Sequence, residues 1–368
     1  MPYVKAARGE SRMLGRIILL EPDTHTMALS SPHSNHDKRS PEGRTDLQLF
    51  ALAATGDLGQ AIADALGQPL SLHEERAFED GEHKARPLDA VAGRDIYVIQ
   101  SLHGGPGMSA NDKLCQLLFF IGALRDAGAA RVTAVVPYLC YARKDRRTKP
   151  NDPVTTRYVA GMFESVGADA IVTLEVHNPS AFENAFRCRT ITLTTTPLFV
   201  DFARSFAHED LCVISPDTGG AKRAELLRET LEAACGRPVA KAFADKHRSG
   251  GVVTGDLLVG DVAGRSAMIV DDLISTGGTL LRAAKAARKA GARRVLALVT
   301  HGLFMPGAEQ VLSDPAIERL IVTDSVPAFR LGERAAFDKL HILPTAPLLA
   351  DAIGRLHDGR TLAELMVF

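Results

Sequence analysis

The sequence predicts an α/β fold with two tandem domains, each a mainly parallel sheet flanked by helices, related by internal duplication. Three observations support this prediction. The chain has 368 residues, more than a single hydrophobic core usually holds, so two domains are expected. Residues 267–270 form an apolar run typical of a buried parallel strand, and a loop and a helical pattern follow it. An earlier segment, residues 92–136, repeats the short glycine-containing sequences that flank that strand–loop–helix unit.

The central motif begins where the predicted strand 267–270 ends. Asp271 and Asp272 follow directly, at the carboxyl end where open α/β sheets bind ligands. Residues 275–279 (Ser-Thr-Gly-Gly-Thr) then place backbone N–H groups and hydroxyls at a helix start, which suits a phosphate. Carboxylates that can hold vicinal hydroxyls, beside such a cradle, predict a site for a phosphorylated sugar. The alternative is an ordinary strand–turn–helix unit, in which paired acids are costly to bury.

Each copy of the repeated unit begins and ends with the same short glycine-containing sequence. One copy runs from Ala-Gly-Arg at 92–94 to Ala-Gly-Ala at 127–129, and the other from Ala-Gly-Arg at 263–265 to Ala-Gly-Ala at 290–292. Each later glycine suits the position after a helix end. Where the second copy has the acid pair, the first has Gln-Ser at 100–101. This asymmetry predicts one sugar-phosphate site and a second ligand; chance agreement between two βαβ units is the alternative.

Two further strand ends carry polar residues. Residues 215–220 (Ser-Pro-Asp-Thr-Gly-Gly) follow an apolar run, and the paired glycines let the backbone approach a pyrophosphate or a second phosphate closely. His177 ends another strand at the edge of a loop. If Asp217 ends a neighbouring strand, His177 and Asp217 can share a divalent metal. An ordinary βα turn and a capping or core histidine are the alternatives.

Three charged segments lie elsewhere in the chain. Residues 141–147 place four cations within five positions, a cluster that suits a polyphosphate because arginine forks match phosphate oxygens bidentately. Residues 244–251 are polar and glycine-ended, which is typical of a mobile loop that can close over a reacting phosphate. Residues 78–82 are typical of a tight acidic turn. The alternatives are a solvated turn for residues 141–147, an exposed linker for residues 244–251 and a plain surface turn for residues 78–82.

Composition excludes several classes of protein. A net charge of −1 argues against nucleic-acid or membrane partners, and no apolar run reaches the length of a membrane span. Five scattered cysteines predict reduced thiols in a cytoplasmic protein.

Residues 21–48 have few apolar side chains to bury, so a disordered N-terminal extension is expected over residues 1–46, with a transit peptide or a misassigned start as alternatives. The apolar run 17–20 is too short for a signal peptide.

The order and spacing of these segments resemble the ribose-phosphate pyrophosphokinase family, also called phosphoribosyl pyrophosphate synthetases, over about residues 47–349. The motif at 271–279 alone also matches type I phosphoribosyltransferases, so the other segments separate the two. The resemblance implies transfer of the diphosphoryl group of ATP, with Mg²⁺ as cofactor, to the 1-hydroxyl of ribose 5-phosphate, with AMP as second product, for nucleotide biosynthesis. It also implies two phosphoribosyltransferase-type domains and dimers that assemble into a homohexamer.

The resemblance assigns roles to individual residues. The catalytic residues would be Lys246 and Arg248. The ATP site would hold Arg143, Lys144 and Asp145, with Phe78, Asp80 and Glu82 supplied by a neighbouring subunit. Ribose 5-phosphate would contact Asp271, Asp272, Ser275, Thr276, Gly277, Gly278 and Thr279. The pyrophosphate loop would be Asp217, Thr218, Gly219 and Gly220, and the metal residues would be His177 and Asp217.

The implied domains are residues 47–190 on the ATP side and 191–345 on the ribose 5-phosphate side. A C-terminal helix and tail follow at 346–368, and the apolar stripe of that helix is expected to pack back on the first domain.

Some residues depart from the family pattern. Lys144, Glu175 and His247 stand where the family usually has Gln, Asp and a basic residue, and the loop 103–108 is longer than usual. These departures leave regulation by phosphate and ADP, and the preferred nucleotide, open. The departures at Lys144 and His247 also motivate an alternative function, a non-catalytic regulatory paralogue that assembles with an active synthetase. A phosphoribosyltransferase, which needs only the motif at 271–279, is the other alternative.

Overall fold

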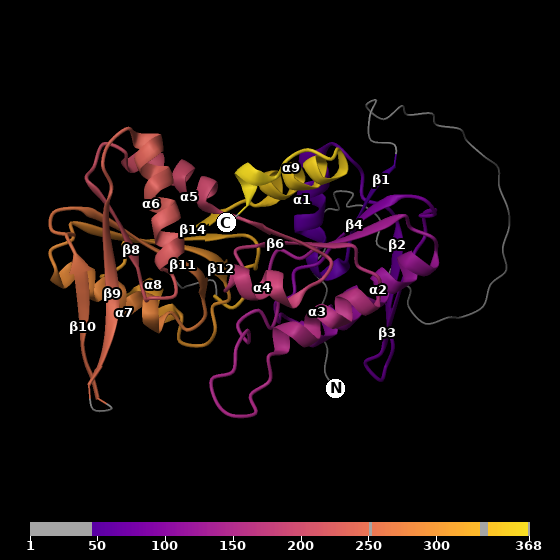
Figure 1. The fold of residues 1–368 in the computed structure, drawn as a ribbon, viewed down its shortest axis with the longest axis horizontal. Helices are drawn as coiled ribbons and strands as arrows, with labels where there is room; N and C mark the ends of the chain where they lie inside the picture. The colour runs from indigo at the N-terminus through magenta and orange to yellow at the C-terminus, as the bar shows by residue number, and fades with distance from the viewer. Residues whose placement is uncertain (1–45, 250–251, 332–337, 367–368) are drawn as a thin grey trace, which may run out of the picture.

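A computed structural model describes residues 46–249, 252–331 and 338–366, and the side chains of residues 245–257 are outside this description. The N-terminal extension expected up to Asp46 therefore lies almost entirely outside the described residues. The described chain forms two α/β halves, each built on its own sheet (Figure 1). No helix within the described ranges is long and apolar enough to cross a membrane.

The first half is a five-stranded parallel sheet with the strand order β1-β4-β5-β6-β7. Its strands are β1 (Leu47–Ala51), β4 (Asp95–Ile99), β5 (Arg131–Val135), β6 (Ala170–Leu174) and β7 (Arg189–Leu193). Its helices are α1 (Gly56–Leu66), α2 (Ala110–Asp126), α3 (Thr155–Ser165) and α4 (Pro179–Ala185). A separate antiparallel hairpin is formed by β2 (His73–Ala77) and β3 (His83–Pro87). The central strands are buried almost throughout, as expected when helices cover both faces of a parallel sheet.

The second half is a seven-stranded sheet with the order β10-β9-β8-β11-β12-β13-β14, parallel except for β10. Its strands are β8 (Leu211–Ser215), β9 (Ala240–Ser249), β10 (Val252–Gly260), β11 (Ser266–Ile274), β12 (Arg294–Gly302), β13 (Arg319–Thr323) and β14 (Leu340–Leu343). The remaining helices are α5 (Thr196–Ala203), α6 (Ala221–Cys235), α7 (Gly278–Lys289), α8 (Glu309–Ser313) and α9 (Ala346–His357).

The two sheets share one topology. The order β1-β4-β5-β6-β7 in the first matches β8-β11-β12-β13-β14 in the second, and each half has an antiparallel hairpin between its first two core strands. The hairpin β9–β10 pairs with β8 and widens the second sheet, whereas β2–β3 forms a sheet of its own. The predicted α/β class, with two mainly parallel sheets flanked by helices, is confirmed, and the shared strand order supports the predicted duplication.

Each half contributes one helix to the other. Helix α9 follows the last strand of the second sheet but packs on α1 (Figure 1). There Leu349 and Ile353 are fully buried in one cluster with Ile62. Helix α5 follows the last strand of the first sheet but packs on α6, where Phe199 and Leu227 share a cluster. An amphipathic helix must cover its apolar face, so this exchange ties the two halves together.

The exchange also bears on how the chain divides into domains. Strand β7 pairs with β6 and runs to Leu193, so the first sheet continues past residue 190. Helix α9 returns to the first half after residue 345, as the apolar stripe of the C-terminal segment predicts. The domain boundaries proposed from the sequence stay a prediction.

We expect Ile353→Ala to lower the free energy of unfolding by about 2–5 kcal/mol, because it leaves a cavity between α9 and α1. Ile342→Ala on β14 is the matched control; that side chain is 50% exposed, so its loss should stay below about 1 kcal/mol. Urea unfolding followed by circular dichroism measures both. Equal losses in the two variants would contradict the packing of α9 on the first half.

Candidate active site between the two halves

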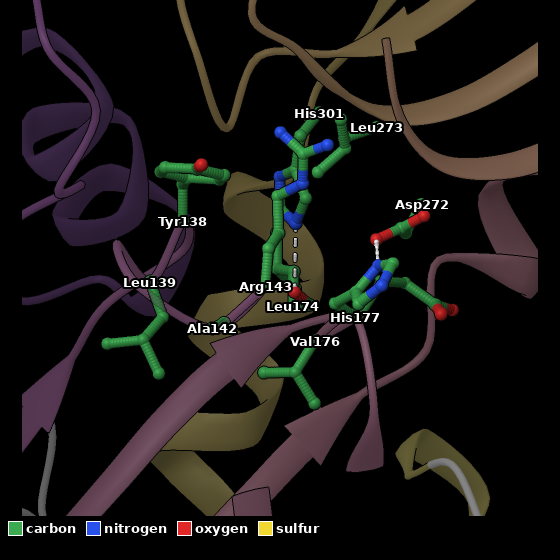
Figure 2. Close-up of a pocket in the computed structure, with 11 residues that line it drawn as sticks. Tyr138, Leu139, Ala142, Arg143, Leu174, Val176, His177, Asp272, Leu273 and His301 are labelled. Carbon is green, nitrogen blue, oxygen red and sulfur yellow. Dashed lines mark hydrogen bonds and ion pairs between the residues drawn. The ribbon is translucent and has the colours of Figure 1, made fainter. Parts of the chain in front are cut away.

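A pocket lies between the two halves, at the carboxyl ends of their strands (Figure 2). The first half contributes the segment after β5 and the end of β6, and the second half contributes the ends of β11 and β12. The polar lining residues are Tyr138, Arg143, Glu175, His177, Asp272 and His301. Because ligands of α/β sheets bind at the carboxyl ends of the strands, this pocket is the candidate active site.

The acid pair lies on β11 itself, because the strand continues to Ile274, beyond its predicted end at residue 270. Oδ2 of the buried Asp272 lies 2.8 Å from Nδ1 of His177, and Figure 2 shows the two side chains pointing at each other. This hydrogen bond raises the pKa of His177. Burial works to raise the pKa of Asp272, but the hydrogen bond from His177 and the charge of Arg223 hold it below its usual range.

The other acid behaves in the opposite way. Burial and the neighbouring charge of Asp272 raise the pKa of Asp271. Two adjacent carboxylates in one poorly solvated place cannot both ionise freely. Without a ligand, Asp272 therefore carries the charge and Asp271 takes up a proton more easily.

Arg223, on α6, lies among these acids, and sequence reasoning did not single it out. Its side chain is 13% exposed, and its Nε lies 3.4 Å from Oε2 of Glu175. Its Nη1 lies 3.7 Å from Oδ1 of Asp271 and 3.8 Å from Oδ1 of Asp272. One signal was present in the sequence: a cation in the first turn of a helix is disfavoured by the helix dipole, so it needs carboxylates nearby.

The predicted phosphate cradle, residues 275–279, forms the turn between β11 and α7. Gly277 caps the helix with a φ of 78°, in the left-handed region that favours glycine. A Cβ atom at this position would lie 2.1 Å from Cγ2 of Val311. The backbone N–H groups in the first turn of α7 lack helical partners and are available to an anion. The cradle therefore has the predicted form, while phosphate binding stays a proposal.

The predicted pyrophosphate loop, residues 217–220, lies directly before α6. Oδ1 of Asp217 accepts hydrogen bonds from the backbone N–H groups of Gly219 at 2.9 Å and Gly220 at 3.2 Å. The carboxylate therefore occupies N–H groups that were expected to hold pyrophosphate, and a ligand can reach them only when this carboxylate turns away. Within the described ranges, no group of three or more His, Cys, Asp or Glu side chains forms a metal cluster.

The predicted ATP residues of the first half behave differently from one another. Arg143 lines the pocket, and Oδ2 of Asp145 accepts a hydrogen bond from Nδ2 of Asn178 at 2.7 Å. Nζ of Lys144 donates to Oδ2 of Asp152 at 2.8 Å, in the turn beyond the pocket. The structure therefore brings Arg143 to the pocket and draws Lys144 to another partner.

Residues 78–82 form the turn of the hairpin β2–β3. Oδ1 of Asp80 accepts a hydrogen bond from the backbone of Glu82 at 3.0 Å, and the guanidinium of Arg76 lies 5.0 Å from the centre of the Phe78 ring. None of Phe78, Asp80 and Glu82 is among the residues that line the pocket. Their contact with adenine from a neighbouring subunit stays a prediction.

Lys246 and Arg248 lie on β9, where their backbone pairs with β10 in the antiparallel hairpin. The expectation of a loop at 244–251 is therefore wrong for residues 244–249, which are part of a strand. Backbone hydrogen bonds to the partner strand β10 stabilise this segment as a hairpin despite its polar composition. The side chains of both cations lie outside the described part of the chain.

At the end of β4 the first half has the neutral residues Gln100 and Ser101, where the second half has the acid pair at the end of β11. Oε1 of Gln100 accepts a hydrogen bond from Oγ1 of Thr55 at 3.3 Å, and the backbone of Ser101 donates to the same hydroxyl at 3.0 Å. In the turn before α1, the backbone N–H of Ala53 donates to the Glu75 carboxylate at 2.6 Å. This turn before α1 corresponds to the turn before α6 in the second half, so here a carboxylate of the chain itself takes the place proposed for pyrophosphate there.

Comparisons with known proteins decide the family. The N-terminal domain of ribose phosphate pyrophosphokinase matches residues 47–167, and the phosphoribosyl synthetase-associated domain matches 253–367. A ribose-phosphate pyrophosphokinase of Parasynechococcus marenigrum is 32% identical over 342 residues, which cover 92% of this chain and 99% of that protein. The chain belongs to the ribose-phosphate pyrophosphokinase family.

Further relatives agree. A ribose-phosphate pyrophosphokinase of Caldanaerobacter subterraneus is 36% identical over 321 residues, 87% of this chain and 97% of that protein. The crystal structure of phosphoribosylpyrophosphate synthetase from Mycobacterium smegmatis matches with a TM-score of 0.76 and 32% identity, over 86% of this chain and 100% of that chain. The family and the two-domain α/β fold expected from the resemblance are confirmed.

His301, on β12, joins the two halves beneath the pocket. Its Nε2 lies 3.0 Å from the carbonyl oxygen of Leu174, and its Nδ1 lies 2.8 Å from Oγ of Ser325. Since a carbonyl can only accept, Nε2 carries the proton and Nδ1 accepts from the hydroxyl. The Tyr138 ring packs edge-on against the imidazole at 5.1 Å. Burial lowers the pKa of His301 to about 4, so the folded protein holds this histidine neutral.

We expect the free energy of unfolding contributed by His301 to be fully present above about pH 6.5 and lost as the pH falls towards 4, because the unfolded chain binds the proton first. The slope from this group reaches at most about 1.4 kcal/mol per pH unit. Chemical unfolding between pH 4 and 8 should show that the free energy of unfolding falls less steeply with decreasing pH in His301→Gln than in the parent protein. His208→Gln, with a side chain 76% exposed, is the control. Identical slopes in His301→Gln and the parent protein would contradict the buried neutral state.

We expect Gly277→Ala to destabilise the fold by roughly 1–3 kcal/mol, because alanine at a positive φ is strained and its Cβ meets Val311. Gly278→Ala is the control, since its Cβ would have only an ordinary contact with the end of Arg282 at 3.7 Å. Thermal unfolding of both variants measures the difference. A Gly277→Ala protein as stable as the Gly278→Ala protein would show that this turn is not constrained as described.

Proposed function

We propose that the chain transfers the diphosphoryl group of Mg²⁺–ATP to the 1-hydroxyl of ribose 5-phosphate, giving 5-phosphoribosyl 1-diphosphate and AMP. The observation that carries the proposal is the contact between His177 of the first half and Asp272 of the second, which sets strand ends of both halves around one pocket. A reaction between two anionic substrates gains most from two sites that face each other. The named relatives support this reaction.

On the ribose side, Asp271 and Asp272 would accept hydrogen bonds from the vicinal hydroxyls of ribose. The start of α7 would hold the 5-phosphate through its backbone N–H groups and the hydroxyls of Ser275, Thr276 and Thr279. The glycine at 277 supports this role, because only a residue without a side chain fits the turn.

On the nucleotide side, Arg143 would contact the ATP phosphates, because a guanidinium fork matches phosphate oxygens. Phe78, Asp80 and Glu82 would reach adenine from a neighbouring subunit, within dimers that assemble into a hexamer. Lys144 is the least supported member of the proposed ATP site, since its ammonium is paired with Asp152.

The residues present fit Mg²⁺. Nδ1 of His177 faces Asp272, so Nε2 is left for a ligand, an arrangement common at metal sites. Asp217 offers carboxylate oxygen close to the proposed pyrophosphate loop. Mg²⁺ keeps several waters and is usually held by one or two carboxylates together with substrate phosphates, so it does not require a cluster of protein ligands. When bound, the metal would stabilise charge on the transferring phosphoryl oxygens.

In the proposed reaction the 1-hydroxyl oxygen attacks the β-phosphorus and gives up its proton to solvent, the bond from that phosphorus to the AMP oxygen breaks, and AMP leaves with that oxygen. Lys246 and Arg248 would stabilise the charge that develops on the phosphoryl oxygens. No covalent enzyme intermediate is needed. The five cysteines, all within the described ranges, are free thiols, which supports a cytoplasmic location for the proposed enzyme.

The protein should form AMP and 5-phosphoribosyl 1-diphosphate in equal amounts from ribose 5-phosphate, ATP and Mg²⁺. Removing a single electrostatic donor costs about 10²–10³ in kcat, so Lys246→Ala should lose about that factor. Lys241→Ala, on the same strand but paired with Glu225, should retain activity. Separation of nucleotides by chromatography measures AMP. Absence of AMP with the parent protein at several phosphate concentrations would refute the proposed reaction.

A second candidate, a non-catalytic regulatory paralogue of the synthetase, is favoured by the pairing of Lys144 with Asp152. In that case the parent protein would form no AMP, and Lys246→Ala would change nothing in the assay.

A further inference from the structure

The acids of the proposed ribose site need a buried counter-charge. Within the described ranges, two cationic side chains form ion pairs with Asp271 or Asp272, namely His177 and Arg223. Glu175 adds a third carboxylate to the same cluster. Of the two cations only arginine keeps its charge at every working pH, so the charge balance of the cluster depends on Arg223.

The contacts of Arg223 differ in kind from that of His177. His177 makes a true hydrogen bond of 2.8 Å to Oδ2 of Asp272. Arg223 approaches the acids to 3.7 and 3.8 Å, beyond normal hydrogen-bond length. It therefore neutralises charge in a poorly solvated place without occupying the acceptor positions of Asp271 and Asp272. Those positions stay open to hydroxyl donors of a sugar.

Glu175 anchors Arg223 from the opposite side. Its Oε1 accepts hydrogen bonds from Oγ1 of Thr194 at 2.9 Å and from the backbone of Thr195 at 3.1 Å. Its backbone has a φ of 36°, a conformation that persists only where the surroundings hold it. The other carboxylate oxygen faces Nε of Arg223. The guanidinium is thus held between an anchored carboxylate of the first half and the acid pair of the second.

We propose that Arg223 is a positioning residue for ribose 5-phosphate: it offsets the negative charge of the acid pair Asp271 and Asp272 and orients that pair for the sugar hydroxyls, and Glu175 holds it in place. This inference rests on the proposed function. It predicts that loss of Arg223 raises the KM for ribose 5-phosphate but not the KM for ATP. The ion pairs of Arg223 are with Glu175 and the acid pair, and none is with a described residue of the proposed ATP site.

Steady-state kinetics of full-length Arg223→Met, Arg223→Lys and Arg228→Met test the proposal. Arg228 is the matched control, an arginine of the same helix with surface carboxylate partners Glu225 and Glu232. In Arg223→Met the KM for ribose 5-phosphate should rise roughly ten- to a hundredfold, with the KM for ATP changed by less than about threefold. Because the contacts to the acids are charge contacts without fork geometry, Arg223→Lys should recover most of the loss. Arg228→Met should behave as the parent protein.

Further measurements separate the possible failures. AMP formation by the parent protein tests the proposed function first, independently of any variant. If Arg223→Met does not fold, as judged by thermal unfolding, Glu175→Gln replaces it and should raise the KM for ribose 5-phosphate in the same direction by a smaller factor. An unchanged KM for ribose 5-phosphate, an equal rise for both substrates, or a lysine variant no better than methionine would overturn the positioning role.

Discussion

Two adjacent, largely buried carboxylates at the end of a central strand are the constraint on which the rest of this structure depends. Asp271 and Asp272 stabilise nothing by themselves, because like charges in a poorly solvated place repel and lose hydration. His177 and Arg223 offset that cost from two different elements. One of them belongs to the first half and the other to the second, so the charge cluster is complete only when the two halves face each other.

The facing arrangement follows from how the duplicated halves are joined. Helices α5 and α9 each leave the sheet they follow and pack on the opposite half, so neither half can bury its apolar surface alone. Equivalent turns of the two halves share some hydrogen bonds and differ in others. Glu175 and Thr195 of the first half correspond to Asp324 and Thr345 of the second half. In each pair the backbone N–H of the threonine donates to the acid, and for Thr345 and Asp324 the distance is 2.8 Å. In the first half, Glu75 satisfies the turn that precedes α1, which is the counterpart of the proposed pyrophosphate loop before α6.

Sequence reasoning found the local backbone features of the site and did not find contacts that depend on distant partners. The turn at Gly277 follows from glycines directly after a strand, and the structure has it. Arg223 was missed because its role depends on Glu175, 48 residues away in sequence. Asp217 accepts hydrogen bonds from its own loop, and its expected metal role stays a prediction. Lys144 is paired with Asp152, which no motif marks, and its assignment to ATP stays a prediction.

By itself, the sequence determined the alternation of strands and helices, the duplication, the acid pair at a strand end and the glycine turn before α7, because these depend on hydropathy and backbone freedom over a few neighbouring residues. Only the tertiary structure decided which charges meet. His177 and Asp272 are 95 residues apart in the chain, and their contact exists because exchanged helices bring two sheets end to end. Burial and charge balance are properties of that assembled space, so no single segment could specify them.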